Sequence, residues 1–149
     1  MVTFQQEKAT ERKEEVKPLI EAHWAEVAPD RDIALDPDWD AYAAAEQHDT
    51  LRTYSVRDDG KLVGYALFFV HPDQHSKGSK VATNDLLYVD PEHRTGFGAG
   101  FILWCNSQLR AEGVQVVRQH VTLLRDFGRA LEALGYTMNG TLWSRRLDR

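Results

Sequence analysis

The sequence predicts a single mixed α/β domain in which helices cover one sheet. Two observations support this fold class. Apolar residues at the helical i, i+3, i+4 spacing occupy several segments, and short runs rich in valine, tyrosine and phenylalanine lie between them. Of the 149 residues, 42% are hydrophobic and 28% are charged, which suits one folded domain over residues 1–149. Strands with interleaved helices around one sheet form a layered α/β fold.

The N-terminal third is predicted to be helical. A helix over residues 7–27 places its apolar side chains on one face, and Pro18 inside it indicates a kink or a restart. Asp36 followed by Pro37 is typical of a helix start, which predicts a short second helix over residues 37–47.

Three strands are predicted next. Residues 51–57 and 61–70 flank Asp58-Asp59-Gly60, which is a hairpin turn signal. Residues 71–80 are polar and contain proline and glycine, so we expect a loop there, before a third strand over residues 81–89.

The C-terminal half continues the alternation of helices and strands. A glycine-rich turn leads into a helix that ends at Gly113, and a strand over residues 114–121 precedes a helix over residues 124–134. Asn139-Gly140 is a strong hairpin signal between two final strands, residues 136–138 and 141–147. The predicted element order is therefore α-α-β-β-β-α-β-α-β-β.

Composition and charge argue against several functions. The formal net charge is -5, whereas a sequence-independent nucleic-acid binder needs a basic surface to displace phosphate counterions. The single cysteine, Cys105, excludes an internal disulfide framework and a Cys-rich zinc site. The longest apolar run, residues 65–70, is too short to span a bilayer, and residues 1–17 lack the apolar core of a signal peptide. We expect a cytoplasmic protein with neither nucleic-acid nor membrane partners.

Residues 86–100 form the most informative segment. A predicted buried strand runs into a turn containing Gly96, Gly98 and Gly100 and then into a helix. Glycines let the backbone approach a ligand closely, and a helix N-terminus offers unpaired N–H groups to a phosphate. The alternative is a tight strand-to-helix connection that binds no ligand. The Gly-Lys-Ser/Thr ending of a P-loop is absent.

This segment resembles the acetyl-CoA-binding motif of the GNAT superfamily of N-acetyltransferases, V-x-P-E-x-R-G-x-G-x-G/A. Four residues match the pattern in place: Val89, Pro91, Glu92 and Arg94. Thr95 and Phe97 stand where glycines are usual, and Leu134-Gly135-Tyr136 is similar to the L-G-F/Y ending of a later helix in the family. The chain resembles the family along its whole element order, and it looks closest to small acetyltransferases encoded by phages and prophages.

The resemblance implies where acetyl-CoA binds. The pantetheine arm is expected along the strand at Leu87, Tyr88 and Val89. The pyrophosphate is expected on backbone N–H groups of Arg94, Thr95, Gly96, Phe97, Gly98, Ala99 and Gly100. The family's sheet is splayed between the strands that here span residues 81–89 and 114–121, and the acceptor amine enters at that gap.

Asp85 and His120 are the candidate catalytic residues. A lysine-type amine has a pKa of about 10.4, so a general base assists its attack on a thioester. Asp85 is predicted on the same sheet face as Leu87 and Val89, at a position where many family members present a basic carboxylate; alternatively, it caps the strand or pairs with Arg118. His120 ends the neighbouring strand and suits a base, unless it only bonds to the backbone.

The acceptor is expected to meet three further residues. Trp39 and Tyr42 of the second helix border the gap, and His75 lines its entrance. His71 and His75 have the spacing of a helical metal pair, but Pro72 removes the helix that such a pair requires, so no metal site is predicted.

The remaining residues with reactive side chains are assigned to packing. His23 lies on the apolar stripe of the first helix, and Cys105 is expected to be a small core residue. The tyrosine that protonates the thiolate in many family members is replaced by Leu131, and Tyr136 is expected to be packed. No general acid is therefore apparent.

The sequence thus predicts an acetyl-CoA-dependent N-acetyltransferase that transfers an acetyl group directly to a primary amine with the help of a general base. The alternative is a catalytically weak or inactive module of the same fold that binds acyl-CoA or a protein partner. A third reading is a toxin-like or host-directed acetyltransferase that modifies a macromolecule. The acceptor is an amine-bearing small molecule or a protein lysine, and the sequence leaves a monomer and a homodimer open.

Overall fold

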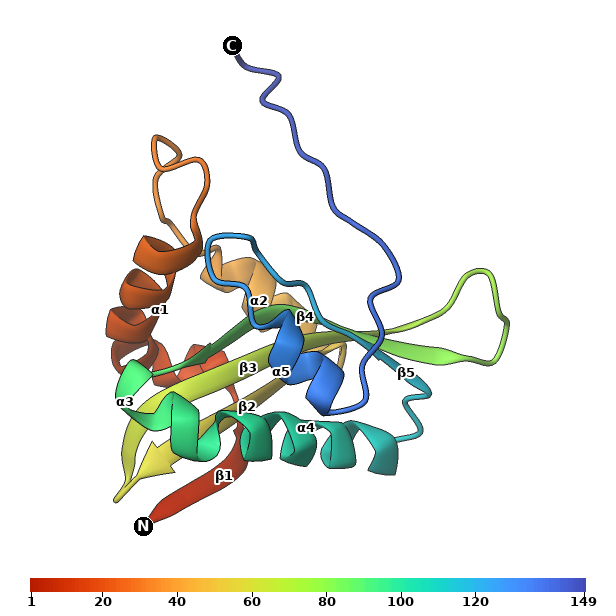
Figure 1. Ribbon diagram of the computed structural model, residues 1–149, viewed down its shortest axis with the longest axis horizontal. Coiled ribbons are helices and arrows are strands. Elements are labelled where there is room, and N and C mark those ends of the chain that lie inside the picture. The colour runs from red at the N-terminus through yellow and green to blue at the C-terminus, as the bar shows by residue number, and fades with distance from the viewer.

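The computed structural model describes residues 1–149 and contains one five-stranded sheet covered by helices on both faces (Figure 1). The strands lie in chain order across the sheet: β1 (Val2–Glu7), β2 (Leu51–Asp58), β3 (Lys61–Pro72), β4 (Lys80–Val89) and β5 (Val116–Arg118). The first four strands pair antiparallel, and β5 runs parallel to β4. The predicted mixed α/β fold is confirmed.

The helical elements divide between the two faces of the sheet. They are a 3-10 turn η1 (Ala9–Arg12), α1 (Lys13–Val27), α2 (Trp39–Gln47), α3 (Pro91–His93), a π-helical turn η2 (Arg94–Gly98), α4 (Ala99–Ala111) and α5 (Gly128–Ala133). Side chains of α1 and α2 pack on one face, and α4 packs on the other. α5 lies beside α4, where the Tyr136 hydroxyl donates to Asn106 Oδ1 at 2.9 Å.

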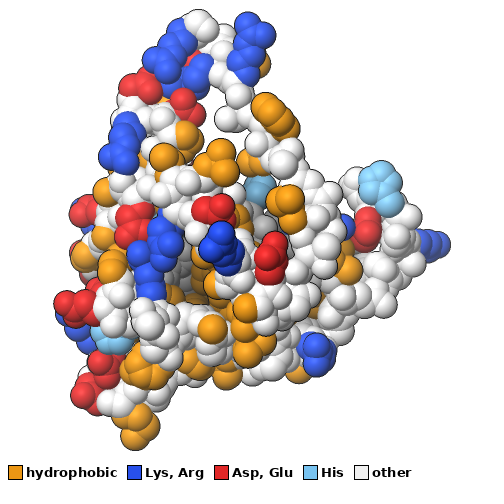
Figure 2. All heavy atoms as spheres, viewed as in Figure 1, with side chains coloured by type: hydrophobic (Ala, Val, Ile, Leu, Met, Phe, Trp, Pro, Cys, Tyr) orange, Lys and Arg blue, Asp and Glu red, His pale blue; other side chains and the backbone are white.

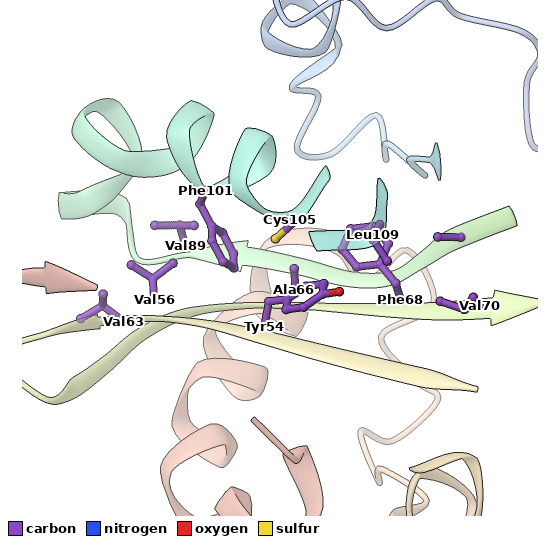
Figure 3. Packing of buried hydrophobic residues seen from close by; sticks show 11 residues of the cluster. Tyr54, Val56, Val63, Ala66, Phe68, Val70, Val89, Phe101, Cys105 and Leu109 are labelled. Carbon is purple, nitrogen blue, oxygen red and sulfur yellow. The ribbon is translucent and has the colours of Figure 1, made fainter. Parts of the chain in front are cut away.

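The main core lies between α4 and the sheet. Phe101, Cys105 and Leu109 project from one side of α4 and are at most 1% exposed (Figure 3). They meet Tyr54 and Phe68 of the central strands. Burial of this apolar surface is the principal force that holds α4 on the sheet.

The β2–β3 hairpin forms as the sequence predicts. Asp59 and Gly60 both have positive φ, 47° and 84°, which is the geometry of a type I′ turn. Gly64 in β3 is required by close strand packing, since a Cβ there would lie 2.8 Å from the Tyr88 carbonyl oxygen.

The predicted boundaries of the N-terminal helices are wrong in two places. Residues 2–7 form β1 rather than leading into a helix, because Val2 and Phe4 alternate toward the α4 core and the backbone pairs with β2. α1 starts at Lys13 and continues through Pro18. α2 starts at Trp39, since Asp38, rather than Asp36, caps it by accepting from the Ala41 N–H.

The predicted strands and helix of the C-terminal segment differ more from the structure than the predicted N-terminal helices do. β5 covers only residues 116–118, and the helix expected over residues 124–134 is confined to α5. The two strands around Asn139-Gly140 do not form; residues 136–149 have no regular secondary structure, and the Trp143 side chain is 88% exposed. An isolated two-stranded hairpin is marginal in water, and the apolar side chains of this segment stay exposed instead of packing on the sheet, so the turn signal alone does not build one.

None of the helices combines the length and the hydropathy that crossing a bilayer requires.

Candidate active site

A β-bulge sets the position of Asp85. In the β3–β4 ladder Phe68 pairs with Asn84 and Leu67 pairs with Leu86, which leaves Asp85 without a partner. The prediction that Asp85 shares a sheet face with Leu87 and Val89 is therefore wrong. Those two residues pack toward α4, whereas the Asp85 carboxylate lies toward α2. The extra residue reverses the alternation of side chains at this point.

The sheet opens between β4 and β5, as predicted. Only three residue pairs join the two strands, Val81–Val116, Ala82–Val117 and Thr83–Arg118. Beyond these pairs, the Asn84 side-chain amide bonds to the backbone of His120. Its Oδ1 accepts from the His120 N–H at 2.5 Å, and its Nδ2 donates to the His120 carbonyl at 3.4 Å. The part of β4 that follows has no strand partner on the β5 side.

The glycine turn at the end of β4 is open to solvent. Gly98 has ordinary helical dihedrals (φ -58°, ψ -51°), and a Cβ built at Gly96 or at Gly98 meets no atom within 4 Å. Neither strain nor crowding explains these two glycines, although alanine would favour the helix by about 1 kcal/mol per position. They leave a backbone surface without side chains in the first turns of the helical segment that begins at Pro91, and a ligand can approach it.

The Arg94 side chain anchors this turn. Its Nε donates to the Val89 carbonyl at 2.7 Å, its guanidinium pairs with Glu26 of α1 at 2.7 Å, and it stacks over the Tyr88 ring at 5.4 Å. Arg125, beyond β5, lies 3.9 Å from the same Glu26 carboxylate. Figure 2 shows a hollow in the face that carries α4 and α5, with hydrophobic side chains inside and charged ones around its rim.

Tyr42 connects α2 to the bulge. Its hydroxyl donates to Asp85 Oδ2 at 2.5 Å, and its ring lies 6.1 Å from that of Trp39. Burial, together with this hydrogen bond, raises the pKa of Tyr42, so the phenol stays protonated and holds the carboxylate in place. The sequence placed Tyr42 near the acceptor, but the distance between α2 and β4 could not be read from spacing.

A cavity of about 500 Å³ lies next to this pair. It is enclosed by α1, the segment that joins α1 to α2, α2 itself and the central strands, and both Trp39 and Tyr42 line it. His75 does not. It belongs to the turn between β3 and β4, where its N–H donates to Asp73, and that turn projects beyond the sheet (Figure 1).

The two candidate catalytic side chains are not joined. No hydrogen bond or ion pair links the Asp85 carboxylate to the His120 imidazole, and Arg118 makes no ion pair with Asp85 either. His120 is exposed and is held through its backbone by Asn84. The structure brings together Asp85, Tyr42 and Trp39, and it leaves His120 as a separate group beyond the end of β5.

The residues assigned to packing are in packed positions. His23 Nδ1 shares a hydrogen bond of 3.0 Å with the Tyr65 hydroxyl, and burial lowers the pKa of His23 to about 4. Cys105 is buried, which raises the pKa of its thiol. Leu131 is also buried, so neither α5 nor α4 offers a proton donor at these positions.

Comparison with known proteins identifies the family. The family model described as the Acetyltransferase (GNAT) family matches residues 14–131, which is more than half of the chain. The chain belongs to the GNAT acetyltransferase family. A search of curated proteins gives no match. Membership of this family supports an acyltransferase enzyme.

Solved structures show the same fold across the whole length of this GNAT protein. A ribosomal-protein-alanine N-acetyltransferase from Brucella melitensis biovar Abortus 2308 has a TM-score of 0.74 at 19% identity, covering 99% of both chains. An aminoglycoside acetyltransferase from an uncultured soil metagenomic sample, in complex with sisomicin, has a TM-score of 0.76 at 15% identity, covering 98% of this chain and 96% of its own. A predicted acetyltransferase with acetyl-CoA from Clostridium acetobutylicum has a TM-score of 0.73 at 11% identity, covering 99% and 97%.

Proposed function

We propose that this GNAT protein is an acetyl-CoA-dependent N-acetyltransferase that acetylates a primary amine directly, with Asp85 as the general base. One observation carries the proposal. The bulge in β4 turns a carboxylate out of the strand at the point where β4 and β5 part, and a cavity lined by Tyr42 lies beside it. Neither strand pairing nor an ion pair requires a carboxylate there.

The residues after β4 fit a coenzyme A pyrophosphate. The backbone from Arg94 to Gly100 carries no Cβ at Gly96 and Gly98, and the Arg94 guanidinium is already paired with Glu26, so we expect the phosphates to lie against the glycine backbone in the first turns of the helical segment that begins at Pro91. The unpaired edge of β4 at Leu87, Tyr88 and Val89 would hold the pantetheine amides. Acetyl-CoA supplies an acetyl group that is activated as a thioester.

The π-helical turn offers an explanation for the unusual glycine register. A π-turn holds one residue more than an α-turn, and such turns are frequent at functional sites. In this chain the wide turn covers Arg94–Gly98, where Thr95 and Phe97 occupy positions that are usually glycine. One extra residue after Arg94 would shift Gly96, Gly98 and Gly100 into the three small-residue positions of the family motif.

The proposed chemistry needs one proton acceptor. The amine nitrogen forms a bond to the acetyl carbonyl carbon, the carbon–sulfur bond breaks, and the surplus proton on nitrogen passes to Asp85, directly or through water. The products are an N-acetyl amide and coenzyme A. Because a thiol has a pKa of about 8.5, the thiolate leaves without a dedicated acid and takes up a proton afterwards. Tyr42 orients the carboxylate, and His120 is the second candidate base.

The test of the base is an Asp85→Asn variant compared with His120→Ala. We expect Asp85→Asn to lower turnover of an accepted amine by about 10²–10⁴-fold, while the thermal stabilisation by coenzyme A stays at the wild-type value. A smaller loss in His120→Ala would support the assignment of Asp85. Near-wild-type turnover in Asp85→Asn across pH 6–9 would contradict it.

The test of the coenzyme site is Gly98→Val with Gly140→Val as a matched control. Neither glycine has positive φ, and a Cβ at either meets no atom within 4 Å, so both variants are expected to fold. Only Gly98→Val should lose the melting shift caused by coenzyme A. Equal shifts in both variants would show that the turn does not bind it.

The second candidate function is a non-catalytic module that binds acyl-CoA or a protein. It is favoured by the separation of Asp85 and His120 and by the buried Leu131 at the expected acid position. Coenzyme A binding without turnover of any amine would support it. Four points stay predictions: the class of acceptor (a small amine or a protein lysine), a homodimer, a phage origin and a cytoplasmic location.

A further inference from the structure

The cavity beside Asp85 has predominantly apolar walls. Ile20 and Trp24 of α1 and Trp39 of α2 form its sides, and Leu67 and Leu86 of the central strands form its floor. Its volume of about 500 Å³ lies within the range of small-ligand sites, roughly 300–1,000 Å³. On the opposite face of the sheet, Phe101, Cys105 and Leu109 of α4 pack directly against the central strands.

The segment between α1 and α2 that borders the cavity is rich in aspartate. Residues 28–40 contain five aspartates and one arginine. Asp30 and Asp32 pair with Arg146 at 3.5 and 2.9 Å, but Asp36 and Asp40 make no ion pair. Asp36 belongs both to the cavity and to a shallow depression that adjoins it. Lys13 lies over the Trp39 ring and Arg31 over the Trp24 ring, so the two unpaired carboxylates attract a cation within a border that carries charges of both signs.

The cavity reaches the bulge of β4. Tyr42 and Leu86 both line it, Tyr42 donates to Asp85, and Leu86 follows Asp85 in the chain. An amine whose apolar part fills the cavity would thus have its nitrogen near the carboxylate. Asp85 itself is exposed and does not line the cavity, so the half-buried Tyr42 lies between the apolar walls and a carboxylate that solvent and an amine can both reach.

We infer that the acceptor is a small primary amine with an aromatic or branched aliphatic body. This inference rests on the proposed function and names its substrate class. Each methylene group buried in the cavity stabilises binding by about 0.8 kcal/mol. A hydroxyl group buried there without a hydrogen-bond partner costs about 1–3 kcal/mol. A polyhydroxylated amine therefore gains nothing from these walls, and a linear polyamine would use the carboxylates but leave the aromatic side chains uncovered.

The direct test is a panel of acceptors assayed at saturating acetyl-CoA: 2-phenylethylamine, isoamylamine, glucosamine, spermidine and a lysine-containing peptide. We expect kcat/KM for the two apolar amines to exceed that of each of the others by at least about tenfold, which corresponds to about 1.4 kcal/mol. 2-Phenylethylamine alone should also raise the melting temperature, which reports binding without turnover.

A matched pair of variants tests whether the cavity wall is responsible. Ile33 lines the cavity and is 52% exposed, whereas Leu103 lies on the outer side of α4 and is 50% exposed. Ile33→Ser should raise KM for 2-phenylethylamine about tenfold with little change in kcat, because it removes apolar contact from the bound body. Leu103→Ser should change neither value, and both variants should retain stabilisation by coenzyme A.

The outcomes separate this inference from the proposed function. If coenzyme A stabilises the protein and glucosamine, spermidine or the peptide is the best acceptor, the apolar substrate class is wrong and the N-acetyltransferase stands. Coenzyme A binding without turnover of any amine in the panel overturns both the substrate class and the catalytic proposal. An equal rise in KM in the two serine variants also contradicts the role of the cavity.

Discussion

The two faces of the sheet differ in how completely they are filled. On the α4 face, Phe101, Cys105 and Leu109 are at most 1% exposed and close against the central strands. On the α1–α2 face, the same strands carry His23–Tyr65 and Tyr42–Asp85 hydrogen bonds and border a cavity of about 500 Å³. The α4 face therefore mainly stabilises the fold, and the α1–α2 face is the proposed site of acceptor binding. We expect substitutions on the α4 face to change stability and substitutions on the α1–α2 face to change substrate binding.

The largest expected effect is the loss of stability in Phe101→Ala. The ring is fully buried and lies 5.4 Å from that of Phe4, so its removal leaves a void that the neighbouring strands cannot fill. The free energy of unfolding should fall by about 3–5 kcal/mol, measured by urea denaturation. Ile33→Ala on the opposite face is the control and should remain within about 0.5 kcal/mol of the wild type. Comparable losses in the two variants would remove the distinction between the faces.

A medium effect is expected from the titration of His23. Burial lowers its pKa to about 4 in the folded protein, against about 6.5 when unfolded, so the unfolded state binds more protons between these values. The neutral ring's contribution to stability is complete above pH 6.5 and is lost as pH falls toward 4, by at most about 3 kcal/mol.

The comparison of His23→Gln with the wild type isolates this contribution from that of the carboxylates. Glutamine keeps a polar group near the Tyr65 hydroxyl but does not titrate, so the variant's stability should decline less steeply between pH 6.5 and 4. The measurement is chemical denaturation at several pH values. Parallel curves for the two proteins would mean that His23 titrates normally.

The smallest effect is expected for Arg146→Ala. Arg146 ties the C-terminal segment to Asp30 and Asp32 through exposed ion pairs, which are screened by solvent and salt. The melting temperature should stay within the error of a thermal scan at both low and high salt. A clear drop in melting temperature would show that the C-terminal segment contributes to stability, as the α4 face does.

Much of the central fold was predictable because its signals are local. The type I′ turn at Asp59-Gly60 requires positive φ at two successive positions, and the end of α4 at Gly113 uses a left-handed glycine, so short sequence patterns locate both. The six residues of β1 alternate too briefly to show a strand, and they form one only because β2 offers an edge. Asn139-Gly140 carries a turn signal, but the flanking residues pair neither with each other nor with an edge strand of the sheet.

The sequence predicted which residues belong to the candidate site, but it did not predict how they are arranged in space. The glycine turn, Asp85 and Tyr42 were identified from motif and position. Their mutual arrangement depended on the bulge, which reverses the face of Asp85 and makes Tyr42 its partner in place of Arg118 or His120. The rule of alternating side chains assumes an unbroken ladder, and no sequence signal marks where this ladder breaks.

β4 contains one residue more than its pairing with β3 uses. Phe68 faces Asn84 and Leu67 faces Leu86, so a chain shortened by Asp85 alone would retain every β3–β4 pair in its present register. A deletion inside a central strand normally turns all later side chains to the opposite face. At this one position the sheet tolerates a change in strand length. Loss of this residue would remove the proposed general base and leave the β3–β4 pairing unchanged.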